Sequence, residues 1–205
     1  MSSRYWLSVT AVVIVAAGAY LFFFNTAPVT NYPSAGTDII AFGDSLVAGT
    51  GSTDGRNFVS LLAQSTGRPI INLGVPGDTT ADGLARMREL DAYKPKVVLL
   101  LLGGNDYLKR IPQEQTFANL AAIIKDIQSR GAVVILLGVR GGLFGDHFSS
   151  GFKKLASTYH TAYVPDVLDG LFGESKYMSD QIHPNDAGYA VIAARIAPVL
   201  QKLLQ

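Results

Sequence analysis

Lys96-Val-Val-Leu-Leu-Leu-Leu102 decides the fold, because every residue after the lysine is apolar and a pair of glycines follows. A run of this length without polar alternation is typical of a central strand in a parallel sheet that is covered on both faces. Four other apolar runs have strand length: Asp38–Phe42, Pro69–Leu73, Ala132–Leu137 and Thr161–Val164. Strand and helix patterns alternate from residue 38 onward, which predicts an α/β domain with helices on both faces of the sheet.

Helical patterns fill the intervals between these runs. Apolar residues recur at helical spacing between residues 117 and 127, and Gly131 is expected to stop that helix. Thr79 or Thr80 can cap an earlier helix, and the last helix is expected to follow Asn185. The order of the patterns is that of one domain, without an internal repeat.

Polar residues that can carry chemistry follow three of the predicted strands. Ser45, Gly77 and Asn105 each come just after a strand, and Asp180 and His183 stand three residues apart before the last helix. Ligands bind at the carboxyl ends of the strands in open α/β sheets, so we expect all five residues to converge on one edge. A serine oxygen needs a base to take its proton, and the base needs an acceptor that fixes its tautomer. The set therefore favours a hydrolase.

Four ordered segments carry a family resemblance: Gly43-Asp-Ser-Leu46, Gly77, Asn105 and Asp180-Gln-Ile-His183. They resemble the four blocks of the SGNH (GDSL) hydrolases, and four blocks in order are far more specific than one motif. Within that superfamily the chain is most similar to the bacterial periplasmic arylesterase, acyl-thioesterase and lysophospholipase group. The resemblance spans residues 38–205 and implies a three-layer α/β/α sandwich with a mainly parallel, five-stranded, flavodoxin-like sheet.

The resemblance also implies a role for each site residue. Ser45 is the expected nucleophile, His183 the base and Asp180 the group that orients the base. The oxyanion hole would be formed by the backbone N–H groups of Ser45 and Gly77 and by the side-chain amide of Asn105. Such fixed donors can each contribute roughly 3 kcal/mol to the stability of a tetrahedral intermediate. No cofactor and no metal are implied.

Each of these residues, when it is taken alone, could instead have an ordinary structural role without a catalytic function. Ser45 could be a helix N-cap, Gly77 and Asn105 could be turn residues, and Asp180 with His183 could be a surface pair of little consequence. Their coincidence in order favours the catalytic interpretation.

Other polar residues near the motifs offer different hypotheses. Asp44, Asp78 and Asp106 could form a metal cluster, but we expect them to fix the loops by accepting bonds from backbone N–H groups. His147 is expected in a loop beside the site and is an alternative base, whereas His160 is expected at the surface or the edge of the core.

Composition limits the other functions. The 205 residues are 48% hydrophobic and carry 17 basic and 16 acidic side chains, so one core is expected and no nucleic-acid partner. The absence of cysteine excludes disulfides and thiol catalysis. The glycines of residues 49–55 are one position too widely spaced for a dinucleotide motif, in line with the expectation of no cofactor. The catalytic domain is expected to be monomeric.

The N-terminal residues form a separate unit. Trp6–Phe24 is an uncharged run of 19 residues, which as a helix would be about 28 Å long and could cross a bilayer. Arg4 precedes it, and by the positive-inside rule the rest of the chain lies outside the cytoplasm. A cleavable signal peptide is the alternative, since Ala17-Gly-Ala19 has the small-x-small form.

The predicted organisation has three parts, and the domain is exported in either case. Residues 1–25 are a membrane anchor or signal peptide, residues 26–37 a linker and residues 38–205 the hydrolase domain. The periplasm or the cell surface is the expected location.

The resemblance also bears on the substrate. The resemblance implies a small-molecule or lipid acyl ester, with aryl and short-to-medium acyl esters first and thioesters or lysophospholipids also plausible. The loop Arg140–Phe148 is either a wall of the acyl pocket or a packed cover without ligand contact. The alternative function is that of an exported carbohydrate O-acetylesterase or a non-catalytic ligand-binding SGNH module.

Overall fold

The sheet is built around β3 (Pro95–Leu101), in which residues 97–101 have no exposed surface. The structure, a computed structural model, describes residues 28–139 and 147–205. Five strands lie in the order β2-β1-β3-β4-β5, and every neighbouring pair is parallel. This strand order is that of flavodoxin-like folds. Successive strands are added on one side of β1 and then, from β3 onward, on the other side, so the topological switch point lies between β1 and β3. The other strands are β1 (Asp38–Gly43), β2 (Ile70–Gly74), β4 (Val133–Leu137) and β5 (Ala162–Val164).

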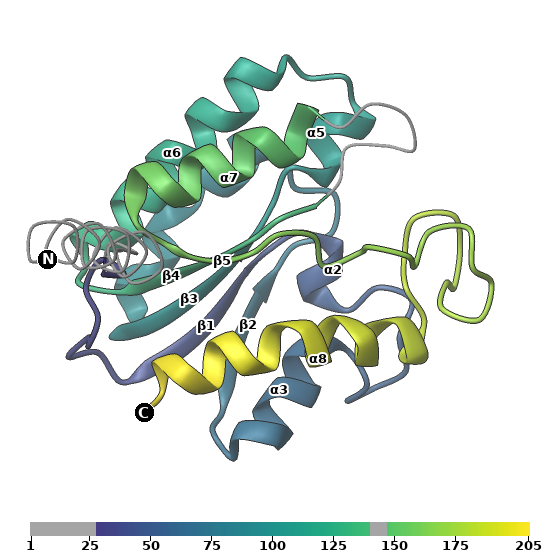
Figure 1. Cartoon of the computed structure of the whole chain (residues 1–205), viewed down its shortest axis with the longest axis horizontal. Helices are drawn as coiled ribbons and strands as arrows, with labels where there is room; N and C mark the ends of the chain where they lie inside the picture. Colours follow the sequence, from purple (N-terminus) through teal and green to yellow (C-terminus); the bar gives the residue numbers. More distant parts are fainter. Residues whose placement is uncertain (1–27, 140–146) are drawn as a thin grey trace, which may run out of the picture.

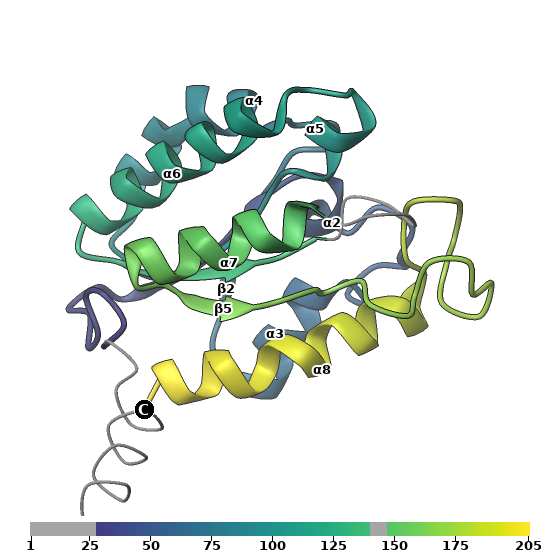
Figure 2. The ribbon, with the colours of Figure 1, turned by 45° about the horizontal axis from the view of Figure 1, so that its top comes forward.

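Helices cover both faces of the sheet, which makes three layers (Figure 1). The two helices α3 (Phe58–Thr66) and α8 (Asp186–Leu203) pack together on one face. On the other face lie α4 (Thr80–Ala85), α6 (Gln113–Ser129) and α7 (His147–Tyr159), as the turned view in Figure 2 shows. The predicted α/β architecture and the five-stranded parallel sheet are therefore confirmed. Short helices complete the chain: α2 (Ser45–Ala48), η1 (Met87–Ala92) and α5 (Gly104–Leu108).

The helix ends follow the expected capping chemistry. Thr79 caps α4, and its side chain and that of Asp82 exchange hydrogen bonds with each other's backbone in a capping box. Asn185 caps α8 by accepting from two backbone N–H groups. Gly131 follows the end of α6 with a φ of 77°, a conformation that favours glycine.

Residues 28–37, which we call the N-terminal segment, cross the amino ends of the strands. The hydroxyl of Ser34 donates to the carbonyl of Gly131, just before β4, at 2.7 Å. The backbone N–H of Thr30 donates to the carbonyl of His160, just before β5, at 2.9 Å. The described part of the predicted linker is thus attached to the domain at the amino-terminal ends of the strands, opposite to their carboxyl ends.

Within residues 28–139 and 147–205, no helix is both long enough and apolar enough to cross a membrane. The predicted span Trp6–Phe24 lies outside the described residues.

Candidate active site

Ser45 lies directly beyond the carboxyl end of β1, as the first residue of α2. The N-cap of this helix is Asp44, whose side chain accepts from the N–H of Leu46 at 3.0 Å. The alternative that Ser45 is itself the cap is therefore wrong. Gly43 allows the end of β1 to approach β3 closely, because a Cβ at this position would lie 2.1 Å from the carbonyl oxygen of Leu101.

Asp180, His183 and Ser45 form a continuous chain of contacts. Nε2 of His183 lies 3.1 Å from Oγ of Ser45, although the two residues are 138 positions apart. Nδ1 of the same ring lies 2.8 Å from Oδ2 of Asp180. Oδ1 of Asp180 accepts from the N–H groups of Ile182 and His183, both at 2.8 Å. These bonds, the one to the His183 side chain foremost, lower the pKa of Asp180 to about 2, so this carboxylate is ionised at neutral pH.

The histidine loop is fixed by its surroundings on both sides. The hydroxyl of Tyr189, a completely buried residue of α8, donates to the carbonyl of Thr50 at 2.8 Å. Gly51 packs so tightly against the loop that a Cβ there would lie 2.6 Å from the carbonyl oxygen of Pro184. The turn after α2 and the start of α8 are thereby joined, which holds His183 over Ser45.

The two other predicted oxyanion donors lie on neighbouring connections. Gly77 follows β2 and Asn105 lies in α5, which follows β3. The side-chain amide of Asn105 donates to the main-chain oxygen of Asp78 at 2.9 Å. Gly77 has a φ of 88°, and a Cβ there would meet nothing within 4 Å. Its backbone conformation, rather than crowding, is therefore what favours glycine at this position.

A cavity of about 680 Å³ opens beside these residues. Ser45, Asn105 and His183 line it, whereas Gly77 and Asp180, both in the described part of the chain, do not. Its volume is in the usual range for small-molecule sites. Most of its wall is apolar and comes from several separate parts of the chain: Leu46, Tyr107, Leu108, Val139, Phe148, Leu168, Phe172 and Ile182.

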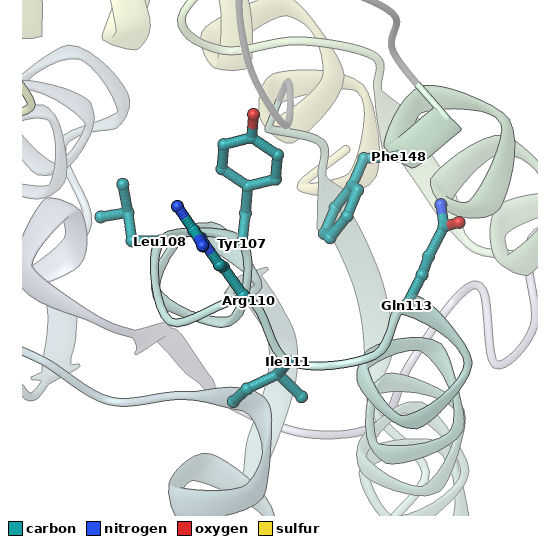
Figure 3. A pocket seen from close by; sticks show the side chains of 6 residues that line it. All are labelled: Tyr107, Leu108, Arg110, Ile111, Gln113 and Phe148. Carbon is teal, nitrogen blue, oxygen red and sulfur yellow. The ribbon is translucent and has the colours of Figure 1, made fainter.

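A second cavity of about 450 Å³ shares part of its lining with the first, and Figure 3 shows the side chains that line this second cavity. Tyr107, Leu108 and Phe148 line both cavities. The rings of Tyr107 and Phe148 meet edge to face, with their centroids 5.7 Å apart. This ring pair forms part of the wall of both cavities. Arg110 and Gln113 also line the second cavity.

The three aspartates beside the motifs fix loops, as predicted, but in different ways. Asp44 caps α2, and Asp106 accepts from the N–H of Thr80 at 2.8 Å, both bonds to backbone N–H groups as expected. Asp78 differs, since its carboxylate pairs with the side chain of Arg86 at 2.6 Å. Among the described residues there is no group of three or more histidine, cysteine, aspartate or glutamate side chains that could hold a metal ion.

Asp44 has an unusual electrostatic environment for a carboxylate beside the serine. The residue is only 3% exposed, and burial raises its pKa to about 7. The charge of Asp78 acts in the same direction, whereas the bond from Leu46 and the nearby His183 oppose the shift. Asp44 is therefore largely protonated below neutral pH.

The two other histidines were expected in a loop beside the site and at the surface or the edge of the core. The first expectation is wrong, because His147 is the first residue of α7. His160 is exposed, as expected, and lies just before the amino-terminal end of β5, whereas Ser45 follows the carboxyl end of β1. Of the loop Arg140–Phe148, for which a pocket wall and a packed cover were the alternatives, residues 140–146 lie outside the described residues. Phe148 is buried and lines the cavity of about 680 Å³.

Two interactions were not predicted from the sequence: the pairing of Arg86 with Asp78 and the bond from Tyr189 to the turn after α2. The first depends on how the end of α4 lies over the strand ends, and the second joins residues 139 positions apart, so no local pattern revealed either of them.

Comparison with known proteins identifies the family of the chain. Residues 41–191 match the GDSL-like Lipase/Acylhydrolase family. The chain is 33% identical to the Esterase TesA of Pseudomonas aeruginosa, over 83% of this chain and 91% of that protein. It is 30% identical to the Thioesterase 1/protease 1/lysophospholipase L1 of Escherichia coli, over 83% of this chain and 86% of that protein.

A solved structure agrees with the sequence comparison. The crystal structure of a protein named TesA superposes with a TM-score of 0.76, at 32% identity, over 82% of this chain and 99% of that chain. The resemblance to SGNH hydrolases that the sequence predicted is confirmed. The chain belongs to the GDSL-like Lipase/Acylhydrolase family.

Proposed function

We propose that this protein is a serine esterase in which Ser45, His183 and Asp180 form the catalytic triad. The observation that carries the proposal is the continuous contact from Oγ of Ser45 through the imidazole of His183 to the carboxylate of Asp180. An ionised Asp180 bound to Nδ1 leaves Nε2 as the basic nitrogen, and that nitrogen is the one facing the serine. The proton of the serine therefore has an acceptor in place.

The reaction proceeds in two acyl transfers. Nε2 of His183 takes the proton of Ser45 as Oγ attacks the acyl carbon, which forms a tetrahedral oxyanion. His183 then gives that proton to the leaving alcohol as the bond between carbon and leaving oxygen breaks. Water repeats the sequence on the acyl-enzyme, and releases the acid and the free serine.

Stabilisation of the oxyanion is assigned to Ser45, Gly77 and Asn105. The backbone N–H groups of the first two and the side-chain amide of Asn105 are the proposed donors. An amide NH₂ has two hydrogens, so Asn105 can keep its bond to Asp78 and still donate to the substrate. Each such donor is worth roughly 3 kcal/mol in the transition state.

The proposed substrates are carboxylic esters with an aryl or a short-to-medium acyl group. The mainly apolar wall of the 680 Å³ cavity supports this class, because it would remove apolar surface of the substrate from water. Two relatives are named esterase and thioesterase/lysophospholipase, so thioesters and lysophospholipids belong in the first substrate panel.

Labelling with a fluorophosphonate tests the mechanism. The probe should modify Ser45, and Ser45→Ala should lose both the label and the turnover of p-nitrophenyl esters. Ser52→Ala is the matched control, because Ser52 lies in the adjoining turn and donates to a backbone carbonyl. A label on another serine, or normal turnover by Ser45→Ala, would refute the assignment.

Acyl chain length and acetylated glycans distinguish the ester classes. An esterase of the proposed kind should hydrolyse p-nitrophenyl esters and should prefer longer acyl groups than acetate. Activity restricted to acetylated oligosaccharides would identify a carbohydrate O-acetylesterase. Binding of esters without turnover by the folded wild-type protein would identify a ligand-binding module.

We also propose that residues 6–24 anchor the protein in a membrane and that the domain lies outside the cytoplasm. The uncharged 19-residue run and the preceding Arg4 support this proposal. The full chain should remain in the membrane fraction after an alkaline carbonate wash, with its domain accessible to added protease. A soluble mature form that begins near Tyr20 would instead identify a cleaved signal peptide.

A further inference from the structure

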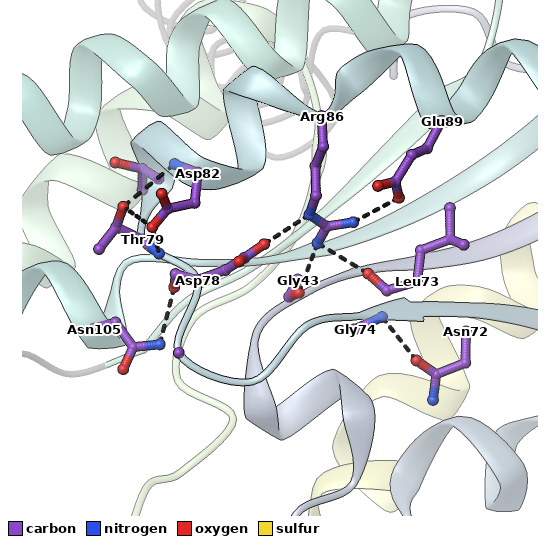
Figure 4. Close-up of polar contacts among 12 residues, drawn as sticks. Gly43, Asn72, Leu73, Gly74, Asp78, Thr79, Asp82, Arg86, Glu89 and Asn105 are labelled. Carbon is purple, nitrogen blue, oxygen red and sulfur yellow. Dashed lines mark hydrogen bonds and ion pairs between the residues drawn. The ribbon is translucent and has the colours of Figure 1, made fainter.

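Arg86, the residue that follows α4, binds the ends of two strands with one side chain (Figure 4). Its Nη2 donates to the carbonyl oxygen of Gly43 at 2.9 Å and to that of Leu73 at 3.0 Å. Gly43 is the last residue of β1, and Leu73 is the next to last of β2. The guanidinium lies 4.0 Å from the centre of the Phe42 ring, and only 14% of the side chain is exposed. Both carbonyls belong to the edge of the sheet from which the proposed catalytic loops emerge.

The same guanidinium also holds the loop that carries Gly77. Nε of Arg86 donates to Oδ2 of Asp78 at 2.6 Å, and Asp78 directly follows Gly77 in the sequence. The main-chain oxygen of Asp78 in turn accepts from the side-chain amide of Asn105 at 2.9 Å. Arg86 is therefore linked, through Asp78, to the two connections that carry the proposed donors Gly77 and Asn105 (Figure 4).

We infer that Arg86 is a positioning residue for the oxyanion hole. By tying the loop after β2 to the end of β1, it fixes the backbone at Gly77 and, through the carbonyl of Asp78, the direction of the Asn105 amide. Ser45 lies two residues after Gly43, so the same guanidinium helps to fix the position of the nucleophile and the positions of the donors. This inference rests on the proposed esterase function and adds to it a residue that need not touch the substrate.

The geometry requires an arginine rather than any cation. A guanidinium presents several N–H donors in a rigid plane, so it can bind two carbonyls and a carboxylate at once. A lysine ammonium on a flexible stem could keep the charge near Asp78 but could not make all three contacts in the same directions. Arg86→Lys therefore retains the positive charge and changes the placement.

The remaining partner of Arg86 provides a matched control. Nη1 donates to Oε2 of Glu89 at 2.9 Å, and the carboxylate of Glu89 is 44% exposed. Glu89 contacts the side of the guanidinium that does not face the strand ends. Glu89→Gln removes an ion pair of Arg86 while the bonds to Gly43, Leu73 and Asp78 remain possible.

The test compares turnover, affinity for an oxyanion-forming inhibitor and thermal stability. Arg86→Lys should lower kcat for a p-nitrophenyl ester by about 10- to 100-fold with KM within about twofold, since small misplacements of oxyanion donors weaken transition-state binding. Its affinity for a trifluoromethyl ketone, which forms a tetrahedral adduct with the serine, should fall by the same factor. The melting temperature is measured alongside, and assays are run well below it. Glu89→Gln should stay within about twofold of the wild type.

A second variant keeps the test decisive if Arg86→Lys does not fold. Asp78→Asn preserves the main-chain oxygen that binds Asn105 but loses the charged partner of Arg86, so kcat and ketone affinity should fall together. In the double variant the losses should not add, because both changes act through one link.

Two outcomes would overturn the inference. One is unchanged kcat and ketone affinity in folded Arg86→Lys or Asp78→Asn, which would leave Arg86 a purely structural residue. The other is a rise in KM alone, which would place Arg86 in substrate binding. Failure of the proposed function has a different signature, namely full activity in Ser45→Ala.

Discussion

Asp44→Asn should remove a pH-dependent loss of stability from the protein. Asp44 is 3% exposed, and its pKa is raised by burial from 3.8 to about 7. Between these two values the folded protein keeps the proton that the unfolded chain releases, so raising the pH favours unfolding. A shift of about 3 pH units, at 1.36 kcal/mol for each, amounts to at most about 4 kcal/mol. Asparagine has nearly the shape of the protonated acid and does not ionise.

Urea denaturation at pH 4, 5, 6, 7 and 8 measures this effect. The unfolding free energy of Asp44→Asn, relative to the wild type, should rise by up to about 4 kcal/mol between pH 4 and pH 8, with most of the change complete near pH 7. Asp82→Asn is the control, because Asp82 is exposed and its pKa is lowered by its bonds to Thr79. That variant should run parallel to the wild type from pH 5 to 8. If Asp44→Asn also runs parallel, Asp44 is ionised in the folded protein and the argument fails.

The other predictions concern catalysis and specificity. Asn105→Ala should lower kcat by about two to three powers of ten with little change in KM, since the lost bond forms mainly in the transition state; steady-state kinetics on a p-nitrophenyl ester checks this, and an effect on KM alone would make Asn105 a substrate-binding group. His183→Ala should reduce kcat on the order of 10⁶-fold and Asp180→Ala on the order of 10⁴-fold, because the aspartate only orients the base and stabilises its charge. If His147→Ala is the inactive variant and His183→Ala is not, the assignment of the base is wrong. Phe148→Ala should join the two cavities and shift the preferred acyl chain of a p-nitrophenyl ester series to greater length, whereas an unchanged optimum would mean that the ring pair does not bound the acyl site.

The strands could be predicted because buried strands consist of continuous runs of apolar residues. Residues 97–101 of β3 are buried on both faces of the sheet, so all five are apolar and the run stands out. Each predicted strand agrees with the structure to within one residue at either end. The start of α7 at His147 was missed because glycines and aromatic residues before it suggested that the loop continues.

The site was predictable to the extent that its chemistry is local. Asp180 and His183 are three residues apart and bond to each other, so spacing alone indicated a unit. The pairing of Asp78 with Arg86 could not be predicted, because it depends on how the end of α4 lies over the strand ends. The raised pKa of Asp44 is likewise a product of burial, which a single sequence position does not reveal.

The attachment of residues 28–37 determines which way a membrane-bound enzyme would face. Only three residues lie between Phe24 and Pro28, and the four Cα–Cα steps between these two positions span about 14 Å when fully extended. The N-terminal segment lies at one end of the strands, whereas α2 and the loop before α8 lie at the other, as both ribbon views show. A seven-residue strand is about 23 Å long, so a tether at Phe24 would hold the amino ends of the strands toward the bilayer and the mouth of the cavity away from it. Such an enzyme would meet dissolved esters, or lipids of an opposing surface, rather than the lipids in which it is anchored.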